Sequence, residues 1–436
     1  MKKVLKNVLF LAIFALIAIL VMNIVYKQIG YGYFKKALSR PGITFFTRDN
    51  KVKYSNMNSY KIENKDYNNS TFYKKIKVKR NTPYRITCMI KTENVNILDR
   101  AYKNSGAKIS LLDSNEQSKC LTGTNDWTKV TLMFNSKQND EISVGFMLGA
   151  ESEYGNVSGT AWFSDIQLEE GNINNDTNWN VACFMFKNVD VTISNKRYNY
   201  SMSETDIKQL RECMLRFKQS CEILSNENMT ITYDIIELET PVNSLSYDEK
   251  RGYYIDPADA EKLIDAYIQK ENYDHIFVCL RLNDEKTAIK CNNWIGLGSM
   301  EYKQIGFSNI RMPTSSKSKK YVYNDETNRF PEEVFVHEFL HSLEKNSEKY
   351  GYKVPALHDY EQYGYNSDSA TGLYNWFKAY MASTIGDDNQ GLNKQIYKLK
   401  PIKESNFKTS KVLEEFEDVT NIFERLKLVI KTMNTY

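Results

Sequence analysis

His337-Glu338-Phe339-Leu340-His341 is the stretch of sequence that decides the fold of the second half of this 436-residue chain. The chain contains only four histidines, so two of them at the H-E-x-x-H spacing form a strong signal. On a helix, side chains four residues apart project from the same face, about one turn from each other. The spacing therefore predicts a helix that presents two imidazoles to a single metal ion.

The flanking residues suit the two ends of such a helix. Proline and acidic residues favour a first helical turn, and Pro331, Glu332 and Glu333 stand there. Gly351 suits the C-terminal end. The helix also has an apolar face for packing, which consists of Val336, Phe339, Leu340 and Leu343.

The same residue types point to hydrolysis at a zinc ion. Two imidazoles one turn apart can both reach one Zn²⁺ at about 2.0–2.1 Å. Glu338 lies beside the first of them, where it can take a proton from water and carry it to a leaving amine. We therefore predict one zinc per chain as the cofactor, His337 and His341 as ligands and Glu338 as the general base.

A catalytic zinc usually has three protein ligands and one open position. We predict His358 as the third ligand, because it follows the Gly351 turn, where a returning loop can reach the metal. Asp359 or Glu361 could ligate instead. Glu344, on the same helical face as the histidines, could ligate or orient a ligand by a hydrogen bond.

The motif resembles that of the zincin superfamily of zinc metallopeptidases, over about Trp294–Met381. The resemblance implies a twisted sheet, an active-site helix and a cleft between two lobes. The metzincin pattern would place Gly at position 344 and a third His at position 347. This chain has Glu344 and Ser347 there, so it departs from that branch of the superfamily.

Residues outside the H-E-x-x-H motif could also contribute to the predicted active site. Tyr363 or Tyr365 could donate a hydrogen bond to the oxyanion that develops during peptide hydrolysis. Met381 could form the methionine turn of metzincins, although such a residue more often fills a core. The glycine-rich segment Gly296–Ile310 could hold an extended peptide by strand addition, because small residues let another backbone approach closely.

Residues 46–171 alternate short apolar stretches with turn residues, which is typical of a β-sandwich. The predicted strands are Tyr73–Val78, Tyr84–Lys91, Ala107–Leu112, Thr128–Phe134, Ile142–Leu148 and Thr160–Leu168. The stretches Tyr84–Thr87, Gly123–Thr128 and Gly159–Ile166 resemble the jelly-roll carbohydrate-binding modules of secreted bacterial enzymes. The resemblance implies a glycan or cell-wall ligand, on which Trp127 and Trp162 could stack, although tryptophans in that fold more often pack internally.

The second half alternates apolar strands with amphipathic helices. The predicted strands include Val181–Phe186, Thr230–Glu237 and His275–Leu282. The predicted helices follow Ser203 as an N-cap, span Asp256–Lys270, and end the chain at about Leu413–Met433. His275, at the start of an apolar strand, is interpreted as structural.

The N-terminus decides the expected compartment. Lys2, Lys3 and Lys6 precede an apolar run, Val8–Tyr26, that is long enough to span a bilayer. The apolar part of a cleaved signal is shorter, about 7–15 residues. We predict that residues 1–27 form an uncleaved signal-anchor helix, in preference to a cleaved signal, with the rest of the chain outside the cell.

Net charge and cysteine content limit the classes of partner and the disulfides that can be expected. A net charge of +4 is small for a chain of this length, and the sequence has no stripe of Lys and Arg with interleaved aromatic residues. We therefore predict that nucleic acid is not a partner. Seven cysteines form no dense framework; Cys279 and Cys291 could bridge, and buried free thiols are the alternative. Because Cys213 and Cys221 stand eight residues apart on one predicted helix, they cannot pair with each other.

The sequence thus predicts a multidomain chain. It has a transmembrane helix (1–27), an all-β jelly-roll sandwich (46–171) and an α+β zincin-type catalytic domain (179–436). The predicted function is a membrane-anchored, single-pass extracellular zinc endopeptidase that acts on a peptide or protein. The alternatives are a surface glycan- or cell-wall-binding protein with a zincin scaffold that is not a peptidase, and a hydrolase of peptidoglycan cross-links.

Overall fold

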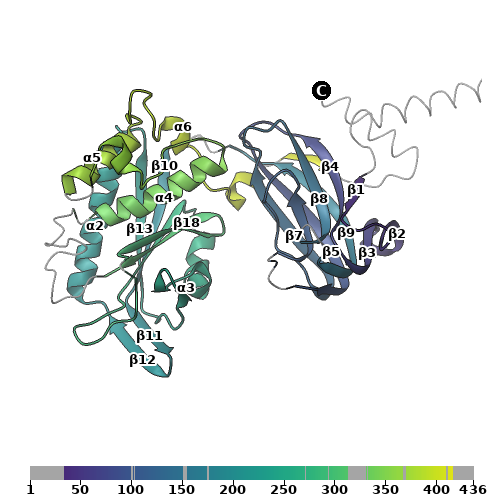
Figure 1. Cartoon of the computed structure of the whole chain (residues 1–436), viewed down its shortest axis with the longest axis horizontal. Helices are drawn as coiled ribbons and strands as arrows, with labels where there is room; N and C mark the ends of the chain where they lie inside the picture. The colour runs from purple at the N-terminus through teal and green to yellow at the C-terminus, as the bar shows by residue number, and fades with distance from the viewer. Residues whose placement is uncertain are drawn as a thin grey trace, which may run out of the picture. The chain divides into compact units, whose positions relative to one another are not determined.

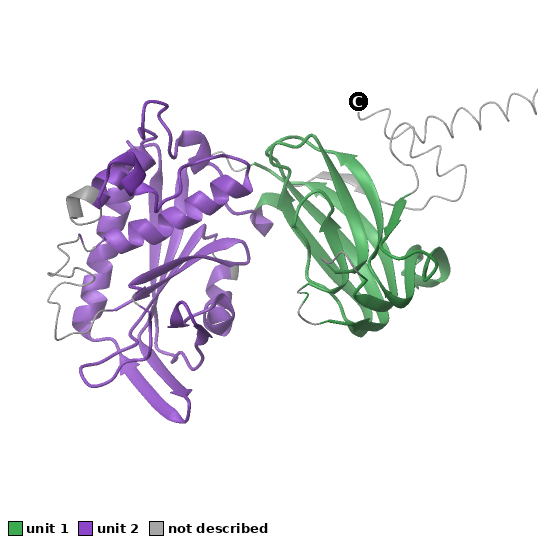
Figure 2. Cartoon of the chain, viewed as in Figure 1, with its two compact units in different colours: residues 1–173, 406–436 green, residues 174–405 purple. Residues whose placement is uncertain are grey.

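The chain folds into two compact units. The computed structural model describes residues 34–99, 102, 104–150, 155–173, 176–270, 272–292, 294–312, 330, 332–366, 370–408 and 411–415. Unit 1 comprises residues 1–173 and 406–436, and unit 2 comprises residues 174–405 (Figure 2). Within the described residues no helix has the length and apolar character needed to cross a membrane. The predicted anchor at 1–27 lies outside those residues.

Unit 1 is a sandwich of two antiparallel sheets. In spatial order the first sheet contains β1 (Lys35–Leu38), β4 (Ser70–Lys77), β8 (Glu141–Gly149) and β6 (Gly106–Leu111). The second contains β2 (Thr44–Tyr54), β3 (Met57–Asn68), β9 (Val157–Glu170), β5 (Pro83–Ile97) and β7 (Gly123–Asn135). The predicted β-sandwich is therefore confirmed, and each of the six predicted strands overlaps an observed one.

The core of the sandwich lies between the two sheets. Every second residue of the central strands is buried there, and the Phe146 and Phe163 rings, one from each sheet, meet with centroids 6.1 Å apart. Strand β1 and the start of β2 lie within residues 27–45, which the sequence predicts to be a connector next to the membrane anchor and not part of the sandwich. Strand β1 could not be predicted from apolar alternation, because all four of its residues are exposed and none has to be apolar.

The C-terminal boundary differs from the prediction. Strand β19 (Lys411–Glu415) pairs with Gln167–Glu170 of β9, so residues 406–415 belong to unit 1 and not to a domain spanning 179–436. Strand β3 pairs with β9 only over Val157–Phe163, which leaves the backbone groups of the last β9 residues to be satisfied by β19. The predicted helix at Leu413–Met433 is therefore wrong at residues 413–415; its remainder lies outside the described residues.

Unit 2 is built on a five-stranded mixed sheet. The order is β13 (Thr230–Leu238), β10 (Asn178–Phe186), β16 (His275–Leu280), β18 (Ile305–Arg311) and β17 (Gly296–Tyr302). The first four strands are parallel, and β17 runs antiparallel to β18 at one edge. Both faces are covered, as the continuous apolar runs of β10 and β16 require.

Helices cover the two faces unequally. Helices α2 (Glu204–Leu224), α4 (Glu333–Lys349) and α5 (Ala370–Met381) share one core with one face of the sheet, and α3 (Pro257–Lys270) packs on the other. In Figure 1, α4 crosses in front of the strands. Ser203 caps α2 in a capping box with Asp206, as its sequence predicts. The remaining elements are β11 (Asn188–Ile193), β12 (Lys196–Ser201), β14 (Ser246–Asp248), β15 (Gly252–Tyr254), α6 (Lys394–Tyr397) and the 3-10 turns η1 (Tyr360–Tyr363) and η2 (Glu404–Phe407).

His275 packs inside this unit, away from the other three histidines. His275 is fully buried against the Phe277 and Phe339 rings, and burial lowers its pKa to about 3. None of the seven cysteines, all of which the structure describes, takes part in a disulfide bond. Cys279 and Cys291 face the cores on opposite sides of the sheet, so they do not bridge, because a disulfide needs adjacent Cβ atoms.

Candidate metal centre

Helix α4 fixes the positions of two histidines. Its apolar residues Val336, Phe339 and Leu340 are fully buried in the core beside the sheet. His337 and His341 project from the other side of the helix and are only partly buried. The helix begins at Glu333 and ends before Gly351, which has a positive φ of 80°. The bounds agree with those expected from Pro331 and Gly351.

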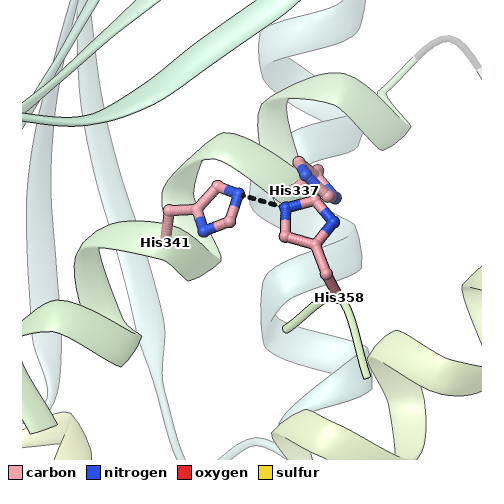
Figure 3. Close-up of side chains that lie close together, drawn as sticks. All are labelled: His337, His341 and His358. Carbon is pink, nitrogen blue, oxygen red and sulfur yellow. Dashed lines mark hydrogen bonds between the residues drawn. The ribbon is translucent and has the colours of Figure 1, made fainter. Parts of the chain in front are cut away.

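His358 joins the two helical histidines. One ring nitrogen from each of the three residues lies within 4.8 Å of the others. The rings of His337 and His341 are centred 4.8 Å apart, and the Nε2 atoms of His341 and His358 are 3.1 Å apart (Figure 3). Among the described His, Cys, Asp and Glu residues, this trio is a group able to hold a metal ion. Asp359, Glu361 and Glu344 do not belong to it.

The donor set fits zinc. Two nitrogens bound to one tetrahedral Zn²⁺ at about 2.0–2.1 Å lie roughly 3.3 Å apart, close to the His341–His358 separation. Partial desolvation lowers the pKa of His358, and the charge of the neighbouring His341 lowers it further. A lowered pKa keeps the imidazole neutral, as a metal ligand must be. The three imidazoles therefore offer a suitable set of ligands.

Glu344 contacts His341 on the same helix. Its Oε2 lies 3.1 Å from His341 Nδ1, and its Oε1 accepts a hydrogen bond of 2.8 Å from the Leu357 N–H. Burial acts to raise the pKa of Glu344, but the two hydrogen bonds together with the charges of His341 and His358 lower the pKa below its ordinary value. An ionised Glu344 holds the proton of His341 on Nδ1, which leaves the Nε2 lone pair free to bind a metal. The structure thus favours the orienting role for Glu344.

Glu338 lies between α4 and the edge strand β17. Its side chain is 5% exposed, and burial raises its pKa to about 7, while the His341 charge and the Gly298 N–H act in the opposite direction. Glycines at positions 296 and 298 make room for it. A Cβ on Gly296 would lie 2.4 Å from Glu338 Oε1, and one on Gly298 would lie 2.6 Å from Oε2. The sequence predicted that these glycines let a substrate backbone approach the strand. In the structure they also leave space for the Glu338 side chain.

We expect Gly298→Ala to lower the free energy of unfolding by about 1–3 kcal/mol, because the added methyl group overpacks the Glu338 carboxylate. Chemical denaturation measures the change. In a Glu338→Ala background the carboxylate is gone, so the same substitution should cost clearly less. An equal cost in both backgrounds would show that the contact with Glu338 is not the cause.

The remaining predicted site residues have other contacts. The rings of Tyr363 and Tyr365 lie against Trp376, with centroids 5.7 and 5.4 Å away, and a role at an oxyanion stays a prediction. Met381 is fully buried in the core at the end of α5. Residues 305–310 form an interior strand, so within Gly296–Ile310 only β17 presents a sheet edge.

Sequence reasoning missed Trp376 and Tyr380, which hold the segment that carries His358. The Trp376 indole N–H donates to the Leu357 carbonyl over 2.8 Å, and the Tyr380 hydroxyl donates to the Pro355 carbonyl over 3.0 Å. The sequence signal that could have identified them is their spacing of four residues, which places both side chains on one face of α5. With 30 tyrosines in the chain, that signal could not be distinguished from ordinary core packing.

Comparisons with known proteins leave the site unassigned. No protein-family model matches the chain. The tRNA nuclease WapA of Bacillus subtilis (strain 168) is 26% identical over 152 residues, a match that covers 33% of this chain. The chain spans 6% of the length of WapA, and the nuclease activity in that name is stated of WapA.

Three solved structures are similar over about a third of the chain. They are the enzymatically active domain of tailspike protein 4 from bacteriophage CBA120 (TM-score 0.25, 10% identity, 32% of this chain and 20% of that one), TmCBM61 in complex with β-1,4-galactotriose (0.22, 13%, 33% and 92%) and the family 11 carbohydrate-binding module of cellulase Lic26A-Cel5E from Clostridium thermocellum (0.20, 13%, 31% and 86%). TM-scores this low carry no argument about function.

Proposed function

We propose that unit 2 is a zinc-dependent peptidase. The observation that carries the proposal is the convergence of His337, His341 and His358, three of the four histidines in the chain, within 4.8 Å. Two come from α4 and one from a segment 17 residues further on, so local helix geometry alone does not bring them together. A zinc ion held there would supply Lewis-acid activation of water and of a substrate carbonyl.

The protein's own residues supply the proton transfer. Glu338 follows the first ligand and lies on the β17 side of α4, where its carboxylate accepts a hydrogen bond from the Gly298 N–H. A buried carboxylate with a pKa near neutrality is suited to take a proton from water and to return it to the leaving amine. Glu344 keeps His341 in the tautomer that binds metal.

Strand β17 supports a peptide as substrate. It is the edge of the sheet, with β18 on one side and no other described strand on the opposite side. Its glycines lie against Glu338, so an extended peptide added to this edge would pass close to the base. A bulge at Ser299, whose φ is +61°, interrupts the strand, and Lys345 Nζ lies 3.3 Å from the Ser299 carbonyl oxygen. We therefore expect pairing to be confined to the residues that precede the bulge.

The test is metal uptake by the full chain. We expect one Zn²⁺ per chain, measured by elemental analysis of protein purified without chelators and by titration of the stripped protein. Removal of zinc should abolish cleavage of a mixed-sequence peptide library, and added zinc should restore it. A chain that neither contains zinc nor takes it up would refute the peptidase function.

Glycan binding by unit 1 is the second candidate function. Trp127 is partly exposed, and its ring contacts the Tyr54 ring with centroids 5.7 Å apart, an aromatic pair of the kind on which sugars stack. Trp162 is not available, because it is 5% exposed and its indole N–H donates to Asp49 over 3.0 Å. Polysaccharide binding by a chain that takes up no zinc would favour this function over the peptidase.

We propose the same location as the one expected from residues 1–27, the outer side of the cell membrane. The apolar run Val8–Tyr26 would anchor the chain in the cell membrane, with both units outside the cell. In that setting, proteins of the cell surface or peptides of the cell wall are the accessible substrates.

A further inference from the structure

His358 lies in a stretch of chain that has no regular secondary structure. Residues 352–358, between α4 and η1, form neither helix nor strand. A helix fixes the side-chain positions of His337 and His341, but nothing of that kind fixes His358. Its position therefore depends on the contacts that hold the segment in place.

Two fully buried side chains of α5 make those contacts. Trp376 donates from its indole N–H to the Leu357 carbonyl, immediately before His358, and Tyr380 donates from its hydroxyl to the Pro355 carbonyl. The two residues are four apart, so they lie on one face of the helix. On the opposite side of the chain, the Leu357 N–H donates to Glu344 of α4.

We propose that Trp376 and Tyr380 are positioning residues that place His358 against the two histidines of α4. This inference rests on the proposed metal site and adds residues that contact neither metal nor substrate. Leu357, the residue before His358, is held from both sides, by Trp376 at its carbonyl and by Glu344 at its N–H. Rotation of the backbone there would carry the imidazole away from His341, so loss of either α5 hydrogen bond weakens the site without removing a ligand.

The core also explains why these side chains are rigid enough for the role. Trp376 stacks on Tyr363 with an interplanar angle of 20° and contacts Tyr380 with centroids 5.4 Å apart. Both belong to the core shared by α4, α5 and the sheet. The segment that carries His358 is thus attached to the same core that supports the helix bearing the other two histidines.

The experiment compares four variants of the full chain. Tyr380→Phe removes one hydroxyl, and Trp376→Phe removes the indole N–H. The controls are Tyr397→Phe and Trp179→Phe. Tyr397 and Trp179 are equally buried in the same core, but they donate to Met381 and to Tyr397, away from His358. Zinc affinity is measured by chelator competition, and unfolding of the stripped protein is measured in parallel.

We expect Tyr380→Phe and Trp376→Phe each to weaken zinc binding by about 3- to 10-fold, and the double variant by about 10- to 100-fold. The two controls should leave zinc affinity within about 2-fold at comparable losses of stability. The Co²⁺-loaded double variant should also show an altered visible spectrum, which a purely structural role would not produce.

The outcomes separate this inference from the proposed function. Unchanged affinity in Tyr380→Phe and Trp376→Phe, or an equal loss in the controls, would overturn the positioning role while a zinc-binding wild type kept the peptidase proposal. A wild type that binds no zinc would overturn both. Tyr380→Phe is nearly isosteric, so it remains a valid test even if Trp376→Phe fails to fold.

Discussion

Glu338→Gln is expected to reduce peptide cleavage by about 10²- to 10⁴-fold while zinc remains bound, because the carboxylate acts on protons and is not in the ligand group. Glutamine keeps the size of the side chain and an oxygen that can accept the Gly298 N–H. The fold around β17 should therefore survive. Cleavage of a mixed-sequence peptide library, followed by mass spectrometry, measures the loss.

The matched control for this substitution is Glu348→Gln, at an exposed glutamate of the same helix. The Glu348→Gln variant should cleave the peptide library at the wild-type rate. Zinc content and the unfolding transition are recorded for both variants, so that loss of metal or fold is not mistaken for loss of the base. If Glu338→Gln cleaves at a rate close to wild type with zinc bound, Glu338 is not the general base.

His358→Ala is expected to weaken zinc binding by at least about 10-fold, because it removes one of three converging ring nitrogens. The remaining pair, His337 and His341, would hold the ion with fewer bonds. Chelator competition on the full chain gives the affinity. Since His358 is exposed, its removal should leave the unfolding transition of the stripped protein almost unchanged.

Three carboxylate variants decide between His358 and the alternative ligands. Asp359→Asn, Glu361→Gln and Glu344→Gln should each retain zinc better than His358→Ala. Glu344→Gln should show the largest loss of the three, because Glu344 contacts His341 Nδ1 and the Leu357 N–H. Loss of zinc in Asp359→Asn or Glu361→Gln with retention in His358→Ala would reassign the third ligand.

Local patterns in the sequence were sufficient for most of the elements. Alternation over Tyr84–Lys91 and Thr160–Leu168 predicted strands of the sandwich, and the Ser203 cap predicted the start of α2. These patterns work because burial on one face of a strand or helix repeats at a fixed period. Strand β1 carries no such period, since all four of its residues are exposed. The pairing of β19 with β9 joins positions more than 240 residues apart, beyond the reach of any local pattern.

The sequence by itself was sufficient to predict the helix of His337 and His341 and to suggest the proposed chemistry, because the spacing of two histidines on one helix is a local property. Only the tertiary structure decided what surrounds them. It places His358 3.1 Å from His341, joins Glu344 to the Leu357 N–H, and shows Glu338 accommodated by the glycines of β17. It also shows Trp376 and Tyr380 of α5 holding the His358 segment. These contacts form between elements that meet only when the core shared by α4, α5 and the sheet is assembled, so their geometry depends on packing and not on sequence spacing.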